Sequence, residues 1–116
     1  MAFKFENLQV WQRALDLTEE VDLVSKNFPK EELYVLTSQI KRAADSVVLN
    51  IAEGCTGQTN PVFKTFLGYS LRSGVEVVSC LFIARKRKII NDADFQNLYE
   101  EYQALIKMIT ALRNTL

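Results

Sequence analysis

The fold is decided by the stretch LTSQIKRAADSVVLNIAEG, which occupies residues 36–54. Its apolar side chains recur every three or four residues, which is the spacing of one face of an α-helix. Leu33, just before the quoted stretch, extends this face. Its members are Leu33, Leu36, Ile40, Ala43, Ala44, Val47, Val48 and Ile51. The pattern predicts a helix over residues 32–53. Gly54 is expected at the left-handed position after the helix, where a Cβ would be costly.

The segment before this helix has the same periodicity. Within residues 8–26 one broad apolar face is formed by Val10, Trp11, Ala14, Leu15, Leu17, Thr18, Val21 and Val24. Asn7 is the expected N-cap because its side-chain oxygen can accept a free backbone N–H. Phe28-Pro29 is expected to end the segment, since proline disfavours helix in the residue before it. A first helix is therefore predicted over residues 8–26.

Two more helices are predicted downstream. The third begins at a Thr59 or Asn60 cap, with Pro61 at the first helical position, and runs to about residue 88. The fourth begins at Asn91, with Asp94 three residues later as in a capping box, and runs to the end of the sequence.

Short connections make neighbouring helices antiparallel, so the fold class is predicted to be all-α, an up-down-up-down four-helix bundle with one domain over residues 1–116. A tight hairpin about Gly57 pairs the second and third helices. Small residues then come level with one another and favour close backbone approach, although ordinary core filling is the alternative. The facing sets are Ala43, Ala44 and Ser46 on one side and Gly68, Ser70 and Leu71 on the other, with Gly74 a turn further on.

The third helix differs from the others because its apolar residues surround it. They are Val75, Val77, Val78, Leu81, Phe82, Ile83 and Ala84. A helix that is apolar all round is normally buried all round. We therefore expect its outer side to pack on another copy of the chain. The alternative is that some of these residues are simply exposed, as scattered apolar side chains often are.

Composition argues against catalysis. The sequence has no histidine, which removes the usual activated nucleophiles and the Glu-x-x-His ligands of di-iron bundles. Cys55 and Cys80 are too far apart in sequence for a CxxC pair and are expected to be reduced thiols or core residues. No catalytic residue, metal ligand or cofactor is predicted. We also expect no signal peptide and no membrane span, and hence a cytoplasmic protein.

Charge is balanced, with 14 Lys and Arg against 14 Asp and Glu, so any nucleic-acid binding must use a local patch. The run Arg85-Lys86-Arg87-Lys88 is the sharpest such feature. Its position at a helix C-terminus suits the helix dipole, which is one explanation. The other is a phosphate-binding patch that an oligomer would repeat, giving salt-sensitive, sequence-independent binding of RNA or DNA.

A polar seam is predicted along the second and third helices, either as a solvated face or as a set of structural contacts. It consists of Gln39, Arg42, Ser46, Asn50 and Glu53 together with Ser73 and Glu76. An Arg42–Glu76 ion pair is feasible. We expect the Glu53 carboxylate to hold the loop to the N-terminus of the third helix, because that helix end attracts negative charge.

The sequence resembles the proteins encoded in intervening sequences of bacterial 23S rRNA genes, often called the S23 ribosomal protein family. The matching parts are residues 5–12 with Ala14, Phe28-Pro29, residues 32–36, the long run 39–54, Phe63, Phe66-Leu67 and Ser73-x-x-Glu76. The resemblance implies a four-helix bundle and a homopentamer. It extends to the accessory variability proteins of diversity-generating retroelements, which associate with a reverse transcriptase. The family supplies no catalytic residue.

The sequence is compatible with two main functions. The first is a non-enzymatic homo-oligomeric scaffold associated with RNA through the basic run. The second is an adaptor for a larger, reverse-transcriptase-like protein partner, without direct nucleic-acid contact. An enzyme or metal carrier is a third and weaker hypothesis.

Overall fold

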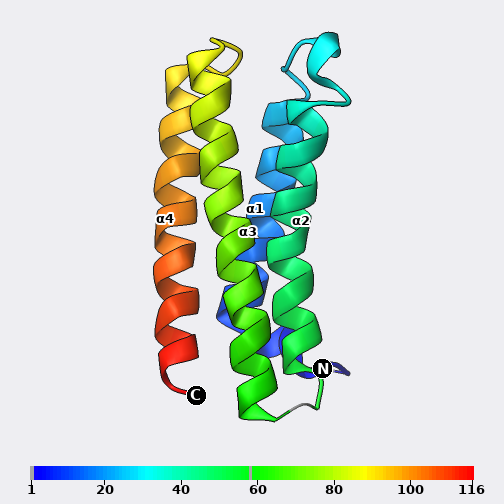
Figure 1. Ribbon diagram of the computed structural model, residues 1–116, viewed down its shortest axis with the longest axis vertical. Helices are drawn as coiled ribbons and strands as arrows, with labels where there is room; N and C mark the ends of the chain where they lie inside the picture. Colours follow the sequence, from blue (N-terminus) through cyan, green and yellow to red (C-terminus); the bar gives the residue numbers. More distant parts are fainter. Residues whose placement is uncertain (1, 58) are drawn as a thin grey trace.

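The computed structural model describes residues 2–57 and 59–116 and contains four long helices (Figure 1). A short 3-10 turn, η1 (Lys4–Asn7), leads into α1 (Gln9–Ser25), and a second, η2 (Lys30–Glu32), precedes α2 (Leu36–Cys55). The remaining helices are α3 (Asn60–Lys86) and α4 (Asp92–Asn114), and the described residues contain no strand. This confirms the predicted all-α fold.

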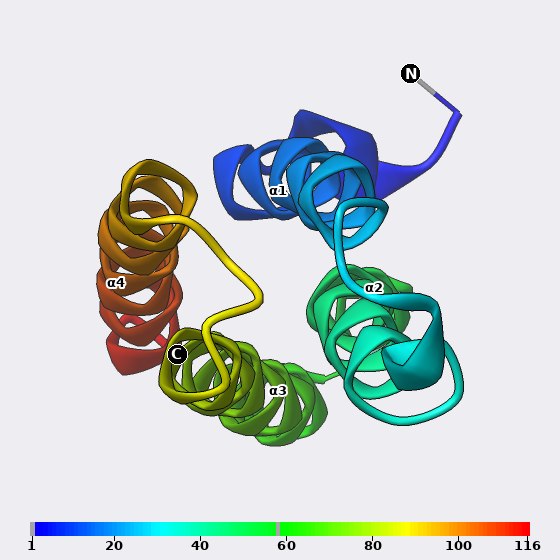
Figure 2. The same ribbon diagram turned by 90° about the horizontal axis from the view of Figure 1, so that it is seen from above.

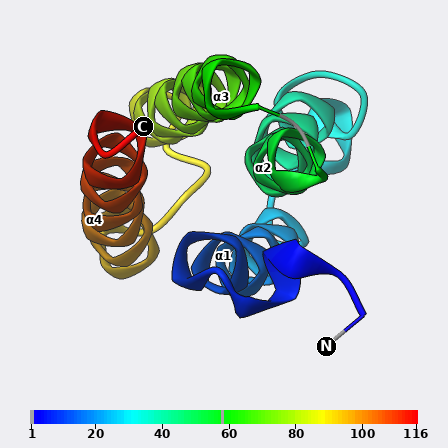
Figure 3. The same ribbon diagram turned by 90° about the horizontal axis from the view of Figure 1, so that it is seen from below.

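The helices follow one another around a four-sided bundle in chain order, each antiparallel to the last (Figures 1 and 2). The η2 corner and the α3–α4 turn lie at one end, while the N-terminus, the α2–α3 turn and the C-terminus lie at the other (Figures 1 and 3). The predicted up-down-up-down order is therefore correct.

The core consists of one apolar stripe from each helix. Leu17 of α1, Ile51 of α2, Leu81 of α3 and Tyr102 of α4 are all fully buried. Burying a large apolar side chain stabilises the fold by about 1.5–3 kcal/mol, so stripes of this length supply most of the driving force.

Two of the predicted caps are present and one is not. Asn91 accepts a hydrogen bond from the Asp94 N–H at 2.7 Å, and Thr59 accepts a long one from the Val62 N–H at 3.4 Å. The Asn7 prediction was wrong, because Asn7 ends η1 and Leu8 stands at the N-cap of α1 without a side-chain hydrogen bond.

The ends of α2 also differ from the prediction. The helix begins at Leu36, since η2 ends at Glu32 and Val35 has a non-helical backbone (φ −120°, ψ −99°). Gly54 lies inside the helix, and the left-handed residue is Gly57 in the following loop (φ +69°). Gly54 is required for another reason: a Cβ there would lie 2.5 Å from the Cβ of Phe66 on α3.

Helices α2 and α3 approach closely, but in a shifted register. The buried Ser70 hydroxyl donates to the Val47 carbonyl at 2.8 Å, whereas a hairpin centred on Gly57 would place Ser70 level with Ala44, three residues earlier. Three residues are about 4.5 Å of helix. The prediction that Gly68 and Gly74 face α2 was wrong, because added Cβ atoms would meet Arg113 and Ile106 of α4.

Candidate functional site

The basic run closes α3 in a turn that fixes its direction. Lys88 has φ +62°, its N–H donates to the Arg85 carbonyl at 3.0 Å, and the Ile89 N–H donates to the Ala84 carbonyl at 3.0 Å. These two bonds define a Schellman motif with a lysine at the position usually held by glycine. The helix therefore ends at Lys86, two residues earlier than predicted.

The four basic side chains are not equivalent. The Arg85 guanidinium lies 4.1 Å from the centre of the Phe95 ring and 5.0 Å from that of Phe82, which is cation–π geometry. Arg87 donates to both carboxylate oxygens of Glu32, at 3.0 and 3.1 Å. This ion pair joins the end of α3 to the η2 corner and neutralises one charge of the run.

Lys86 and Lys88 have no carboxylate within 4.0 Å among residues 2–57 and 59–116. With Arg85 they border an open depression of about 680 Å³ whose other walls include Phe82 and Ile83. The depression is too open to enclose a small molecule. It presents two unpaired ammonium groups beside apolar surface, which is a combination suited to a phosphate-bearing polymer.

The outer surface of α3 is partly apolar, as the sequence indicated. Val77, Leu81 and Ala84 point inward and are fully buried, whereas Val75 and Phe82 are 59% and 44% exposed. A second depression, about 240 Å³ and almost wholly apolar, lies between Val75 and Val78 of α3 and Tyr99 and Ile106 of α4. Of the apolar residues predicted to surround α3, those on its outward side are thus in contact with solvent in the single chain.

By length and composition alone, α3 could cross a membrane, because an 18-residue window has a mean hydropathy of 1.3. A helix of a soluble bundle can meet the same criterion, and the inward stripe of α3 packs against α2 and α4. Its middle also carries Arg72 and Glu76, which would be costly at the centre of a bilayer. The absence of a membrane span stays a prediction.

The predicted polar seam is present only in part. The Ser73 hydroxyl donates to the Ser46 hydroxyl at 2.8 Å, and the Asn50 amide donates to the same oxygen at 2.9 Å. Gln39 donates to the Glu76 carboxylate at 3.4 Å. This small network connects α2 with α3 on one side of their interface.

Two members of the seam lie outside that network. Arg42 is exposed and makes no ion pair with Glu76 or with any other described carboxylate; Gln39 binds Glu76 instead. Glu53 is exposed, and its backbone carbonyl, not its carboxylate, holds the loop by accepting from the Thr56 hydroxyl at 2.8 Å. No hydrogen bond joins its carboxylate to the described residues at the start of α3.

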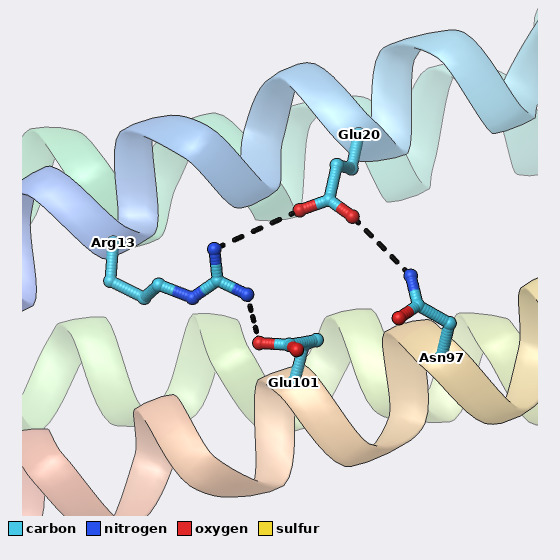
Figure 4. A network of polar contacts seen from close by, with 4 residues as sticks. All are labelled: Arg13, Glu20, Asn97 and Glu101. Carbon is cyan, nitrogen blue, oxygen red and sulfur yellow. Dashed lines mark hydrogen bonds and ion pairs between the residues drawn. The ribbon is translucent and has the colours of Figure 1, made fainter.

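A second polar network, on the opposite side of the bundle, was not predicted. Figure 4 shows Arg13 and Glu20 of α1 facing Asn97 and Glu101 of α4. Arg13 binds Glu101 and lies 3.9 Å from Glu20, which accepts from the Asn97 amide at 3.3 Å. The hydrogen bond with Glu101 raises the pKa of the Arg13 guanidinium above its ordinary value. The spacings 13–20 and 97–101 place each pair on one helix face, so the signal was in the sequence.

The chemistry of the described residues is sparse. Both cysteines are buried and free, and burial raises the pKa of each thiol, so neither is an activated nucleophile at neutral pH. No group of three or more potential metal-ligating side chains was found in the part of the chain that the structure describes. The candidate sites are therefore surfaces.

Fold and surfaces together define a small helical-bundle protein whose prominent features are a basic turn and an apolar outer helix. The model of the 23S rRNA-intervening sequence protein family matches residues 6–111. The chain belongs to that family, which confirms the resemblance drawn from the sequence. The further relation to the accessory variability proteins of retroelements stays a prediction.

A solved structure shares this fold. A crystal structure of a protein of unknown function from the S23 ribosomal protein family of Bacteroides thetaiotaomicron superposes with a TM-score of 0.83 at 18% identity. The match covers 90% of this chain and 97% of the other. A search among curated proteins returned no match.

Proposed function

We propose that this protein is a non-enzymatic scaffold that self-associates through the outer surface of α3 and binds RNA through Lys86 and Lys88. The observation that carries the proposal is the exposed apolar surface of α3, which includes Val75 and Phe82. Burying such surface is worth about 25 cal/mol for each Å². A second copy of the chain is the partner that is always available, and five copies is the number that the family resemblance suggests.

Self-association is tested by multi-angle light scattering at micromolar concentration. We expect a mass that is a multiple of the 13.3 kDa chain, with five copies as the favoured number. Val75→Glu should lower that mass, because it places a charge in the proposed contact. Leu49→Glu on α2 is the matched control, since Leu49 is 57% exposed against 59% for Val75. A monomeric wild type, or an equal effect of both variants, would refute this surface.

RNA binding is tested by fluorescence anisotropy with a labelled single-stranded RNA over a range of salt concentrations. Affinity should fall with salt, and each lost phosphate contact should reduce the slope of log K against log salt by about 0.7. We expect Lys86→Gln with Lys88→Gln to lower both affinity and slope. Arg87→Gln should have a smaller effect, because Glu32 already neutralises Arg87.

Lys64→Gln with Lys107→Gln is the control for net charge, because both lysines are exposed and lie away from the basic turn. If this control weakened binding as much as the Lys86 and Lys88 pair, the basic turn would have no special role. No binding at low salt would remove RNA from the proposal.

The adaptor function is the second candidate, and the apolar depression between α3 and α4 favours it. Its lining is almost free of polar surface, so it could receive an apolar helix of a partner protein. A partner that stays bound after nuclease treatment and is released by Val75→Glu would support the adaptor over direct RNA contact.

A further inference from the structure

The outer surface of α3 borders two depressions that have no lining residue in common. Val75 and Val78 line the apolar depression toward α4, whereas Phe82 and Ile83 line the open depression at the basic turn. Phe82 lies about two turns, or about 10 Å, beyond Val75 along the helix. A subunit contact centred on Val75 can therefore leave the Phe82 end of α3 open to another partner.

The ring of Phe82 is fixed in place although 44% of the residue is exposed. Its centre lies 5.3 Å from that of Phe95 and 5.9 Å from that of Tyr99, and both contacts have edge-to-face geometry. Phe95 and Tyr99 belong to α4 and stack on each other at 5.8 Å. The exposed part of the Phe82 ring thus has a set orientation, and a ligand that covers it orders no mobile side chain.

Arg85 is held beside this ring by the same aromatic cluster. Its guanidinium lies 5.0 Å from the centre of Phe82 and 4.1 Å from that of Phe95. It makes no ion pair with any carboxylate in the part of the chain that the structure describes. The guanidinium is therefore positioned without being neutralised, and its planar set of N–H donors suits a phosphate group.

The ring and the cations match the two parts of a nucleotide. Arg85, Lys86 and Lys88 line the same depression as Phe82 and can contact a phosphate. The aromatic ring suits the planar base, which stacks on such rings. Bases present a free face only where they are unpaired and unstacked, because neighbouring base pairs cover both faces of a base within a duplex. The combination thus indicates a single strand.

We propose that Phe82 and Arg85 form a platform on which one unpaired base stacks, so that the basic turn of α3 selects single-stranded over double-stranded RNA. The inference rests on the proposed RNA binding, to which it adds the class of RNA and the residue that selects it. Charge alone predicts the opposite preference. A duplex carries about twice the negative charge of a single strand over the same length, so a site made of lysines only would bind the duplex more tightly.

The test compares a labelled single strand with a duplex of the same length by fluorescence anisotropy over a range of salt concentrations. We expect the single strand to bind about tenfold more tightly. Phe82→Leu keeps an apolar side chain but removes the aromatic ring. It should weaken binding of the single strand about tenfold and leave binding of the duplex unchanged. The slope of log K against log salt should also stay the same, because no phosphate contact is lost.

Tyr69→Leu is the matched control variant. Tyr69 lies on α3 and is also 44% exposed, but it belongs to the half of the helix away from the basic turn, so its loss should leave RNA affinity unchanged. Inorganic polyphosphate is the matched ligand, since it offers phosphates without bases. Its inhibition constant against labelled RNA should be equal for wild type and Phe82→Leu. Light scattering should give both variants the mass of the wild type.

Two results would overturn the platform while RNA binding itself stands. One is equal affinity for single strand and duplex, and the other is an equal effect of Phe82→Leu and Tyr69→Leu. A lower mass of Phe82→Leu with weaker binding of polyphosphate would also overturn it, because Phe82 would then act through assembly. Absence of binding to either RNA at low salt would remove the proposed RNA function and this inference with it.

Discussion

Tyr102 places a hydroxyl inside the bundle without a hydrogen-bond partner. The residue is fully buried, and its burial raises the pKa of the phenol well above its ordinary value. The unfolded chain hydrogen-bonds this group to water, so folding loses that interaction. Tyr102→Phe should therefore stabilise the protein by about 1–2 kcal/mol.

Urea denaturation of wild type and Tyr102→Phe measures the effect directly. Tyr69→Phe is the control, because Tyr69 is 44% exposed and its hydroxyl loses little on folding. A destabilised Tyr102→Phe variant would mean that the hydroxyl has a partner in solution, such as a buried water molecule.

Lys88 adopts the left-handed conformation, which costs a residue with a Cβ about 1–2 kcal/mol. Lys88→Gly should raise the free energy of unfolding by about 1 kcal/mol, since glycine also gains freedom in the unfolded chain. Thermal denaturation checks this. The same substitution at the neighbouring helical Lys86 should lower stability, and equal effects at both positions would contradict the assignment of the turn.

At the scale of the element, α2 and α3 depend on the absence of a side chain at Gly54. A Cβ there would lie 2.5 Å from the Phe66 Cβ, which is fixed to a helix backbone and cannot move aside. Gly54→Ala should destabilise the protein by about 1–3 kcal/mol. Gly68→Ala is the matched helical control: its nearest neighbour, the flexible Arg113 side chain, is 3.7 Å away.

Gly68→Ala should be neutral or stabilising by up to about 1 kcal/mol, because alanine favours the helix. Chemical denaturation of both variants gives the comparison. Equal destabilisation would show that the glycines act through helix propensity or the unfolded chain, and that the close approach at Gly54 carries no cost of its own.

The elements also show what periodicity can and cannot predict. Apolar spacing identified all four helices, because each stripe is long and regular. It could not set the rotation of one helix against the next, so Gly68 and Gly74 were assigned to the α2 interface although they face α4. The shift in register, about one turn, had the same origin. Periodicity also could not decide that Gln39, and not Arg42, lies within hydrogen-bonding distance of Glu76.

The candidate site was predictable where local sequence decides it. Arg85 to Lys88 stand out as a charge run, but the contacts that distinguish them come from elements far along the chain, Glu32 for Arg87 and Phe95 for Arg85. The stacking role of Phe82 gave no sequence signal, because the ring that fixes its side chain, Phe95, belongs to the next helix. Tertiary contacts, not residue types, determine which cations are free.

At the scale of the whole molecule, stability should fall at alkaline pH. Burial raises the pKa of the Cys55 and Cys80 thiols, so the folded protein holds protons that the unfolded chain releases above its ordinary cysteine pKa of 9.0. Below that pH both states are protonated and the thiols contribute no pH dependence. Above it the unfolded state binds fewer protons, and the free energy of unfolding must decrease as pH rises. Tyr102 adds to the decrease above its ordinary pKa of 10.0.

Urea denaturation from about pH 7 to about pH 10 measures this decrease. Replacing both cysteines with alanine should lower stability at neutral pH, because Cys80 is fully buried and a small cavity forms, yet it should flatten the alkaline fall. The cavity lowers the free energy of unfolding at neutral pH, whereas the loss of the thiols reduces its fall at alkaline pH. The two effects can therefore be told apart. A wild-type curve that is flat to pH 10, or a double variant with the wild-type slope, would show that the thiols reach solvent, which is incompatible with their place in this bundle.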